Sequence, residues 1–266
     1  MVLETQTDGR LRVLRLNRPE RKNALNDELL KAIVVALREV AHDDDVRAVA
    51  ITGNGDAFCS GLDLNQRSAS GAVSEDTDRQ ARPEDDDAAD HLSLLMRVEC
   101  EKPVLAGVNG VAVGIGLSLA MNADIRIAAP SARFHPGYAR VGTSPDGGLT
   151  WTLTHAVGYE RTMRFLLEQR MVSAGEALAL GLVGEVTETD GDFERRFIEY
   201  GQMLAEVAPI AARQTKRLVV RIDRPPHLAA HLNDEIDLAL HGLASDDSKE
   251  AIRAMASHER PEFTGH

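Results

Sequence analysis

The chain has 266 residues, of which 43% are hydrophobic and 27% charged, a composition typical of a globular protein with a substantial core. Its formal net charge of −12 argues against general nucleic-acid binding, which needs a basic surface. No apolar run is long enough to span a membrane, the first residues are too polar for a signal peptide, and Cys59 and Cys100 form no disulfide framework. We therefore expect a cytoplasmic protein with no membrane and no nucleic-acid partner.

The first hundred residues alternate between strand and helix patterns. Residues 11–16 alternate as a strand does, and after the turn "NRPERKNAL" either Asn26 or Asp27 caps a helix that runs to about Val40. Residues 46–52 predict a second strand, and residues 53–64 predict a glycine-rich loop. We interpret the polar residues 65–88 as a mobile surface segment that shapes a substrate pocket, followed by a helix near 89–100.

The remaining pattern divides the chain at about residue 191. Up to there it predicts a strand and turn over 102–110, a helix from Gly116, strands near 125–130 and 132–134, and helices over 149–157 and 160–167. Ser173 with Glu176 forms a capping box for a further helix that ends at Gly181, before a short strand in "LVGEV". Residues 192–266 are helical, with prolines at the breaks. We therefore predict an α/β core over 1–191 and a helical region over 192–266.

Two glycine-rich turns draw attention because the usual nucleotide and metal signatures are missing. The sequence contains no GxGxxG, P-loop, HExxH, paired CxxC or GxSxG motif, so we expect no metal site. The turns are "AFCSGLDL", directly after a strand, and "NGVAVGIGLSLA", which leads into a helix. Each alone is most simply a tight turn, but two converging backbone N–H groups would form an oxyanion hole.

Taken together and in order, several motifs resemble the enoyl-CoA hydratase/isomerase (crotonase) superfamily. They cover nearly the whole chain: "NRPERKNAL", "AVAITGNGDAFCSGLDL", "KPVLAGVNGVAVGIGLSLAMNADIRIA", "ARVGTSPDGG", "VGYERTMRFLLEQRMVSAGEALALGLVGEV" and "AMASHERPEFTG". The resemblance implies a ClpP/crotonase-like spiral core of repeated ββα units. It implies that the C-terminal helices form trimers or hexamers. It also implies an acyl-CoA thioester substrate, with no separate cofactor because coenzyme A is part of that substrate.

The resemblance assigns roles to individual residues. The N–H groups of Leu62 and Ile115 occupy the positions of the two oxyanion donors, and Ile115 stands where the family usually has glycine. The implied coenzyme A contacts are Arg21, Lys22, Ser60, Leu62, Asp63, Leu64 and Arg260. Each of the basic residues taken alone is typical of solvated surface charge.

The sequence departs from the hydratase pattern at both of its acids. Hydratase members carry two glutamates, and the matching positions here are Ser118 and Tyr138, which we keep as accessory candidates. Neither is a carboxylate, and a tyrosine is a poor base at neutral pH. Asp146, eight residues after Tyr138, matches the single acid of certain isomerase branches, including the epoxyphenylacetyl-CoA isomerases. One carboxylate suffices to move a proton between two carbons, and we expect burial beside Leu62, Ile115 and Val141 to tune it.

Several alternatives remain open for Asp146. It could cap the helix that starts at Leu149, or simply occupy a turn after Pro145. It could also be the nucleophile of a dehalogenase- or hydrolase-type acyl-CoA enzyme, since the 4-chlorobenzoyl-CoA dehalogenase branch pairs such an acid with an aromatic residue eight positions earlier. The chain could instead be an enoyl-CoA hydratase, or an acyl-CoA-binding protein without turnover. We expect Trp151 to lie in the core and Cys59 to be a small buried residue without a catalytic role.

Overall fold

The computed structural model describes residues 1–63, 92–139, 144–221 and 245–266. Its strands form two sheets, one of six strands in the order β1-β2-β3-β5-β7-β10 and one of four in the order β4-β6-β8-β9. The strands are β1 Leu3–Asp8, β2 Leu11–Leu16, β3 Ala48–Gly53, β4 Ala57–Cys59, β5 Val104–Val108, β6 Val111–Val113, β7 Ile125–Ala128, β8 Arg133–His135, β9 Val172–Ser173 and β10 Glu185–Val186.

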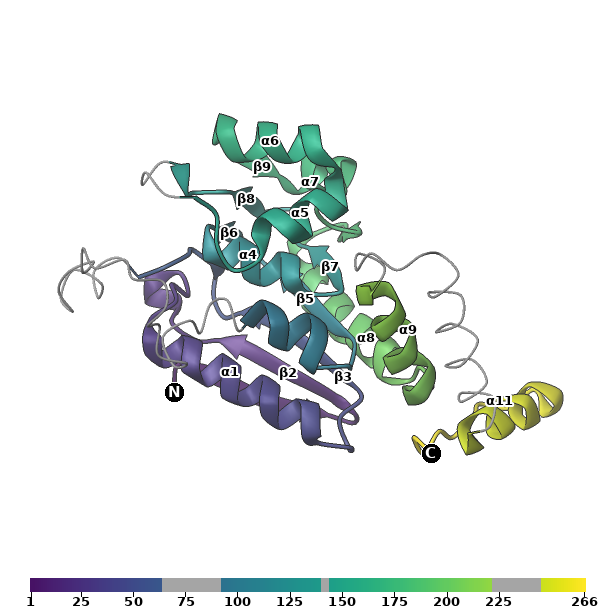
Figure 1. Cartoon of the computed structure of the whole chain (residues 1–266). Helices are drawn as coiled ribbons and strands as arrows, with labels where there is room; N and C mark the ends of the chain where they lie inside the picture. The colour runs from purple at the N-terminus through teal and green to yellow at the C-terminus, as the bar shows by residue number, and fades with distance from the viewer. Residues whose placement is uncertain (64–91, 140–143, 222–244) are drawn as a thin grey trace, which may run out of the picture.

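Helices surround the two sheets (Figure 1). The α-helices are α1 Asp27–His42, α4 Ile115–Asn122, α5 Leu149–Val157, α6 Tyr159–Glu168, α7 Ala174–Leu180, α8 Phe193–Ala205, α9 Pro209–Arg221 and α11 Asp246–Ser257. Two short 3₁₀ helices, η1 Pro19–Arg21 and η4 Asp190–Asp192, and a π-helix, η2 Leu95–Glu99, complete the described elements. Within the described residues, no helix is both long and apolar enough to cross a membrane.

The strands come in consecutive pairs that divide between the sheets. β3, β5 and β7 belong to the six-stranded sheet, and the strands that directly follow them, β4, β6 and β8, belong to the four-stranded sheet. Neighbours within each of these sets are parallel. Since each strand pair leads on toward a helix, the chain winds as a repeated ββα unit, as predicted.

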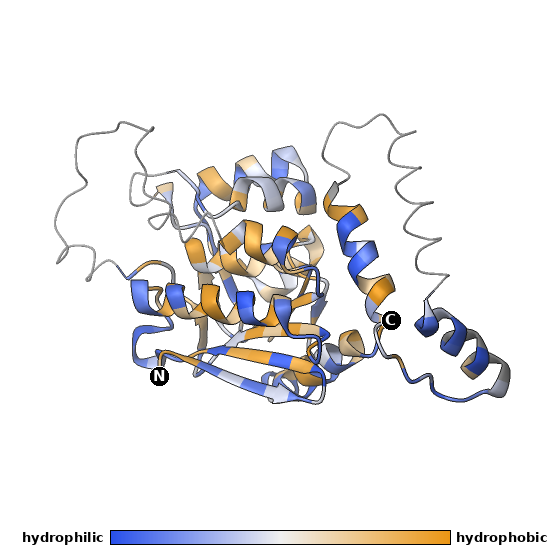
Figure 2. Cartoon of the chain, turned by 60° about the horizontal axis from the view of Figure 1, so that its bottom comes forward, coloured by the Kyte–Doolittle hydropathy of each residue, from blue (hydrophilic) through white to orange (hydrophobic). Residues whose placement is uncertain are grey.

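The central strands β3 and β5 of the six-stranded sheet are buried on both faces, because their side chains alternate between two hydrophobic clusters. Val49 and Ile51 of β3 belong to the larger cluster with α1 and α4, whereas Ala48 and Ala50 belong to a cluster with Phe197 of α8. Figure 2 shows orange, hydrophobic stretches along the strands that lie beside the helices. Thus α8, although it follows the predicted boundary at residue 191, covers one face of the core sheet.

Local signals account for the best-predicted helices. Asn26 caps α1 by accepting a hydrogen bond from the Leu29 N–H at 2.9 Å, and Ser173 and Glu176 form the predicted capping box of α7. The bounds predicted for α5 agree with the structure. The sequence pattern does not predict β1, β4, β6 or β9, because β1 has the polar sequence "LETQTD" and the others have only two or three residues.

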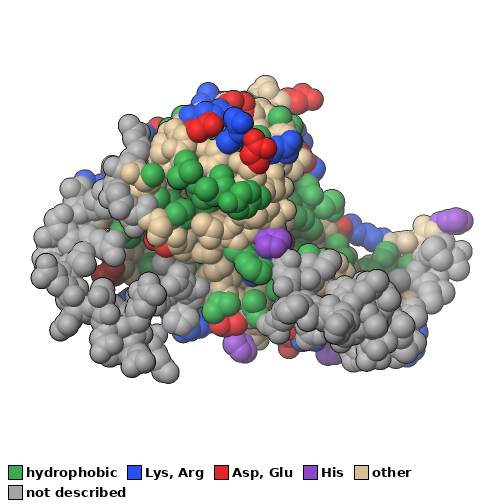
Figure 3. Space-filling model, turned by 45° about the horizontal axis from the view of Figure 1, so that its top comes forward, with side chains coloured by type: hydrophobic (Ala, Val, Ile, Leu, Met, Phe, Trp, Pro, Cys, Tyr) green, Lys and Arg blue, Asp and Glu red, His purple; other side chains and the backbone are tan. Residues whose placement is uncertain are grey.

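Several helical side chains lie at the surface rather than in the core. Trp151 is 50% exposed, so its predicted core position is wrong. Its ring contacts His155, with ring centroids 4.6 Å apart. Large hydrophobic side chains gather on the face shown in Figure 3, and the described exposed ones on α5, α6, α7 and the α6–α7 connection are Trp151, Tyr159, Met163, Leu167, Met171 and Leu178. Assembly into trimers or hexamers stays a prediction.

Candidate active site

Three neighbouring strands of the four-stranded sheet end at one edge of it. β4, β6 and β8 run parallel, so the segments that follow them meet at their carboxyl ends. This edge is where α/β proteins usually bind ligands. The segments carry several of the predicted site residues, among them Leu62, Ile115, Ser118 and Tyr138.

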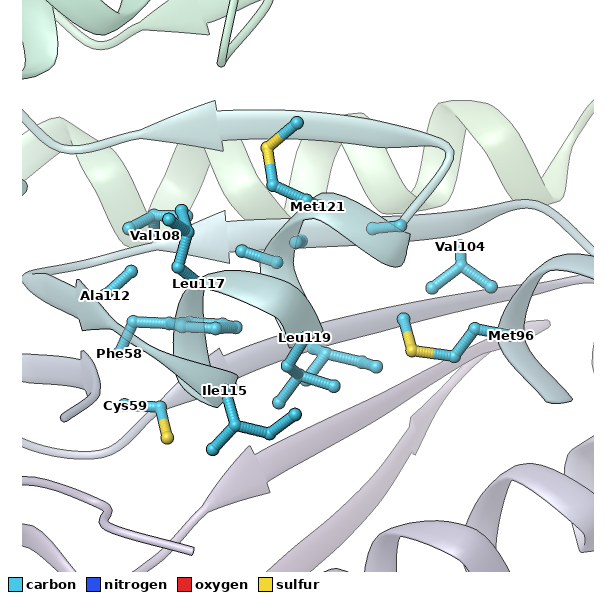
Figure 4. Packing of buried hydrophobic residues seen from close by; sticks show 14 of the residues in the cluster. Phe58, Cys59, Met96, Val104, Val108, Ala112, Ile115, Leu117, Leu119 and Met121 are labelled. Atoms are coloured by element: carbon cyan, nitrogen blue, oxygen red, sulfur yellow. The ribbon is translucent and has the colours of Figure 1, made fainter. Parts of the chain in front are cut away.

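The two glycine-rich turns are in direct contact at this edge. Gly61 has φ of 100°, and a β-carbon there would lie 3.0 Å from the Val113 carbonyl oxygen. A β-carbon on Gly116 would lie 2.4 Å from the Cys59 carbonyl oxygen, so only glycine permits this approach of α4 to β4. Figure 4 shows Cys59 and Ile115 as members of the buried cluster that packs between these elements. The predicted burial of Cys59 is confirmed, since its exposure is 0%.

The backbone N–H groups of both predicted oxyanion donors, Leu62 and Ile115, take no part in the hydrogen bonds of any described strand or helix. Leu25 forms a parallel bridge to Leu62. In this bridge the Leu25 N–H donates to the Gly61 carbonyl, and the Asp63 N–H donates to the Leu25 carbonyl. The Leu62 N–H therefore points away from Leu25. Ile115 begins α4, where N–H groups have no intrahelical partner. Within the described residues neither N–H donates a backbone hydrogen bond, which leaves both available to a ligand oxygen.

Asp146 is joined to both accessory candidates. The Tyr138 hydroxyl donates a hydrogen bond of 2.6 Å to Asp146 Oδ1, and it lies 2.8 Å from Ser118 Oγ. Asp146 itself is exposed, so the expected burial of this residue is wrong. Val141, predicted beside it, lies outside the described residues. The structure thus brings together residues from three separate segments of the chain.

Asp146 does not cap α5. The N-cap of that helix is Gly148, and no side chain makes a capping hydrogen bond there. Asp146 contributes only its backbone carbonyl, which accepts from the Leu149 N–H at 3.2 Å. The helix-capping alternative is therefore wrong, and the carboxylate accepts a hydrogen bond from Tyr138 instead.

Tyr138 and Ser118 are neutral hydrogen-bonding groups in a buried setting. Ser118 is fully buried and Tyr138 is 6% exposed. Burial, and next the hydrogen bond with Asp146, raise the pKa of Tyr138 above its ordinary value. At neutral pH the phenol stays protonated, so Tyr138 can donate a hydrogen bond but cannot act as a base.

A buried amide, missed by the sequence analysis, holds the backbone of the Asp146 turn. Asn122 Nδ2 donates to the carbonyls of Ser118 at 2.9 Å and Gly147 at 2.8 Å, and its Oδ1 accepts from Ser93 Oγ at 2.7 Å. Asn122 is 1% exposed in a helix whose every residue is buried. A polar residue in such an apolar helix needs a partner, and that pattern was the signal available in the sequence.

Three of the predicted coenzyme A contacts lie together. The Ser60 N–H donates to the Lys22 carbonyl at 3.0 Å, and Ser60 Oγ donates to the Arg21 carbonyl at 3.3 Å. Arg21 and Lys22 are exposed, and the Lys22 ammonium forms an ion pair with Asp56. Such an exposed pair is weak, so both cations can turn toward an anionic ligand at this edge.

Two of the other predicted contacts, Asp63 and Arg260, form ion pairs outside this group. Asp63 is 8% exposed, and its carboxylate lies 2.8 Å from the Arg18 guanidinium in a buried ion pair. Arg260 follows α11, which lies far from α4 in Figure 1, and it pairs with Glu206. Leu64 lies outside the described residues. The described residues also contain no group of three or more His, Cys, Asp or Glu side chains that could hold a metal ion.

Comparison with known proteins identifies the family. The family model described as enoyl-CoA hydratase/isomerase matches residues 6–266. The chain belongs to this family. Among its relatives, a "Probable enoyl-CoA hydratase" of Rhodobacter capsulatus is 36% identical over 96% of this chain and 95% of its own length. A "1,2-epoxyphenylacetyl-CoA isomerase" of Escherichia coli is 32% identical over 95% of this chain and 94% of its own length.

Solved structures of the family agree with the architecture. A putative enoyl-CoA hydratase from Streptomyces coelicolor A3(2) matches with a TM-score of 0.90 at 31% identity, covering 100% of this chain and 95% of that one. An enoyl-CoA hydratase from Bacillus anthracis matches with a TM-score of 0.89 at 27% identity, covering both chains fully. The predicted family and its α/β crotonase fold are confirmed.

Proposed function

We propose that this family member is an acyl-CoA enzyme that shifts a carbon–carbon double bond, with Asp146 as the base that moves the proton. The observation that carries the proposal is the Asp146 carboxylate, which accepts a hydrogen bond from Tyr138, while Tyr138 in turn contacts Ser118 of α4. The Asp146 turn lies against the first turn of α4, since a β-carbon on Gly147 would be 2.5 Å from Ile115 Cδ1. The residue that follows Asp146 therefore packs against the side chain of Ile115, whose backbone N–H is one of the proposed oxyanion donors.

The chemistry needs no other acid. With a 3-enoyl-CoA, the Asp146 carboxylate takes a proton from C2, and the electrons move onto the thioester oxygen to form a dienolate. The N–H groups of Leu62 and Ile115 stabilise the negative oxygen by about 3 kcal/mol each. Asp146 then returns its proton to C4, which leaves the double bond between C2 and C3. The base is regenerated, so atoms and charges balance without any activated water.

Hydration by two acids has little support at this site. Addition of water needs one group to accept its proton while another donates one. The residues beside Asp146 are Ser118 and a tyrosine whose phenol stays protonated. A hydratase is nevertheless the second candidate, because the Rhodobacter capsulatus relative carries that name, while the name of the Escherichia coli relative supports an isomerase.

The substrate in this proposal carries coenzyme A, which is not a separate cofactor. The exposed cations of Arg21 and Lys22 beside Ser60 suit the anionic nucleotide end of coenzyme A. They supply the local positive charge that a chain with a net charge of −12 needs for an anionic ligand.

The test compares Asp146→Asn with the wild type on 3-enoyl-CoA and 2-enoyl-CoA substrates. Because a positioned base contributes about 10²- to 10⁴-fold, we expect isomerisation to fall by that factor. Asp45→Asn is the matched control, since its side chain is fully exposed, and it should leave the rate unchanged. Rapid hydration that Asp146→Asn does not alter would refute the isomerase. Thioester hydrolysis through an Asp146 acyl adduct would favour the nucleophile alternative, and binding without turnover would favour an acyl-CoA-binding protein.

A further inference from the structure

We infer that Tyr138 is a positioning residue for Asp146, which fixes Oδ1 and leaves Oδ2 as the oxygen that takes and returns the proton. In this arrangement Ser118 fixes the direction in which the Tyr138 hydroxyl points. The inference rests on the proposed function, because it assigns a task to each oxygen of the proposed base.

The hydrogen-bond directions follow from the number of hydrogens available. A phenol has one hydrogen, and Tyr138 gives it to Asp146 Oδ1 at 2.6 Å. In the 2.8 Å contact between Ser118 Oγ and the Tyr138 oxygen, Ser118 must therefore be the donor. The other acceptors of Ser118 are more distant, the Asp146 carbonyl at 3.1 Å and the Gly114 carbonyl at 3.4 Å. The result is a chain of donors that ends on one carboxylate oxygen.

The second carboxylate oxygen is left for chemistry. Asp146 is exposed, and within the described residues its Oδ2 accepts no hydrogen bond. A carboxylate with one oxygen held and one open offers a single basic site in a defined direction. Fixing that direction lowers the entropy lost on reaching the transition state.

Tyr138 is itself rigidly held, which a positioning residue requires. Its ring belongs to the main hydrophobic cluster. The preceding Gly137 has φ of 78°, and a β-carbon there would lie 3.3 Å from the Gly114 nitrogen. The end of β8 is thus packed against the turn that leads into α4. Since burial keeps the phenol protonated, the donated hydrogen bond persists over the neutral and mildly alkaline range.

Tyr138→Phe tests the inference because it removes only the hydroxyl. We expect kcat for isomerisation to fall about 10- to 100-fold, the range for a hydrogen bond to a charged group, while KM changes less than about threefold. With substrate deuterated at C2, the fraction of deuterium delivered to C4 should also fall, because a loose carboxylate exchanges its deuteron with water. Tyr200→Phe is the matched control. Tyr200 lies on α8 beside Arg196, and this variant should match the wild type in both measurements.

Ser118→Ala provides the second arm and covers the case in which Tyr138→Phe fails to fold. We expect a smaller fall in kcat with KM unchanged, and the double variant should be no slower than Tyr138→Phe alone, because Ser118 acts through Tyr138. Unchanged kcat in either single variant, or losses that multiply in the double variant, would overturn the inference. Asp146→Asn separates the two proposals. If Asp146→Asn abolishes isomerisation while Tyr138→Phe does not slow it, only the positioning role of Tyr138 is refuted. If Asp146→Asn is fully active, the role of Asp146 as the base is refuted, and the positioning role with it.

Discussion

Asn122→Ala should impair both the stability and the catalytic rate of this protein, because Asn122 fastens the Asp146 turn to α4. Its amide makes three hydrogen bonds of 2.7 to 2.9 Å, to Ser118, Gly147 and Ser93, and it is 1% exposed. Truncation to alanine removes all three and frees the Gly147 carbonyl, the direct backbone neighbour of Asp146.

The expected cost can be worked out from these contacts. Three buried hydrogen bonds at about 1 kcal/mol each amount to about 3 kcal/mol. Alanine regains roughly 0.6 kcal/mol through its higher helix propensity. The free energy of unfolding should therefore fall by about 2 kcal/mol. Because a displacement of Asp146 by about 1 Å can cost about 100-fold in rate, we expect kcat to fall at least about tenfold.

Asn109→Ala is a control with the same chemical change at the opposite end of β6. Asn109 Nδ2 donates to the carbonyls of Gly55 at 3.0 Å and Ala57 at 3.2 Å, and its Oδ1 accepts from the Gly53 N–H at 3.2 Å. Loss of these bonds should lower the free energy of unfolding by a similar amount. Since Asn109 precedes β6 and the site follows it, kcat of the folded variant should remain unchanged.

The assay combines denaturant unfolding, at one fixed protein concentration, with isomerisation kinetics well below the unfolding transition. Asn122→Ala must lower both quantities, whereas Asn109→Ala must lower only stability. If Asn122→Ala loses stability but keeps the wild-type kcat, the reasoning that Asn122 positions the Asp146 turn is wrong. An equal loss of kcat in both variants would show that the rate merely follows stability.

Two further predictions concern buried groups that take no part in the proposed chemistry. Lys216→Met should lower the free energy of unfolding by about 3 kcal/mol or more, because the buried ammonium donates to two carbonyls and lies 2.8 Å from Asp124. The control Arg217→Met, which breaks a half-exposed ion pair on the same helix, should cost under about 1 kcal/mol. Equal losses of stability in the two variants would contradict a role for α9 in the core. Burial raises the pKa of the Cys59 thiol to about 12, so iodoacetamide should not label Cys59 in the folded protein at about pH 8 and should label it in guanidinium. Because folding favours the neutral thiol, the contribution of Cys59 to stability is complete below the ordinary thiol pKa of about 8.5 and is lost as the pH rises toward about 12. Labelling of Cys59 in the folded protein would contradict its burial.

Local chemistry in the sequence accounts for much of the fold. The cap at Asn26, the capping box at Ser173 and Glu176 and the bounds of α5 all depend on residues within a few positions of each other, and the structure agrees with each. The ordered motifs indicated the family, which the family match over residues 6–266 confirms. They also placed glycines at the two turns that must approach closely.

Contacts between distant parts of the chain account for the rest, because a hydrogen-bond partner far along the chain leaves no local pattern. The three-residue strand β4 is defined by its pairing with β6, and β6 is defined by its pairing with β4 and β8. Asp63 is paired with Arg18, 45 positions away, so its carboxylate is held within the protein. The sequence by itself singled out Asp146 as the one carboxylate at a recognised position. Only packing could determine that Asp146 is exposed, that it does not cap α5 and that Tyr138 holds one of its oxygens, because each depends on how β8, α4 and the Asp146 turn meet in space.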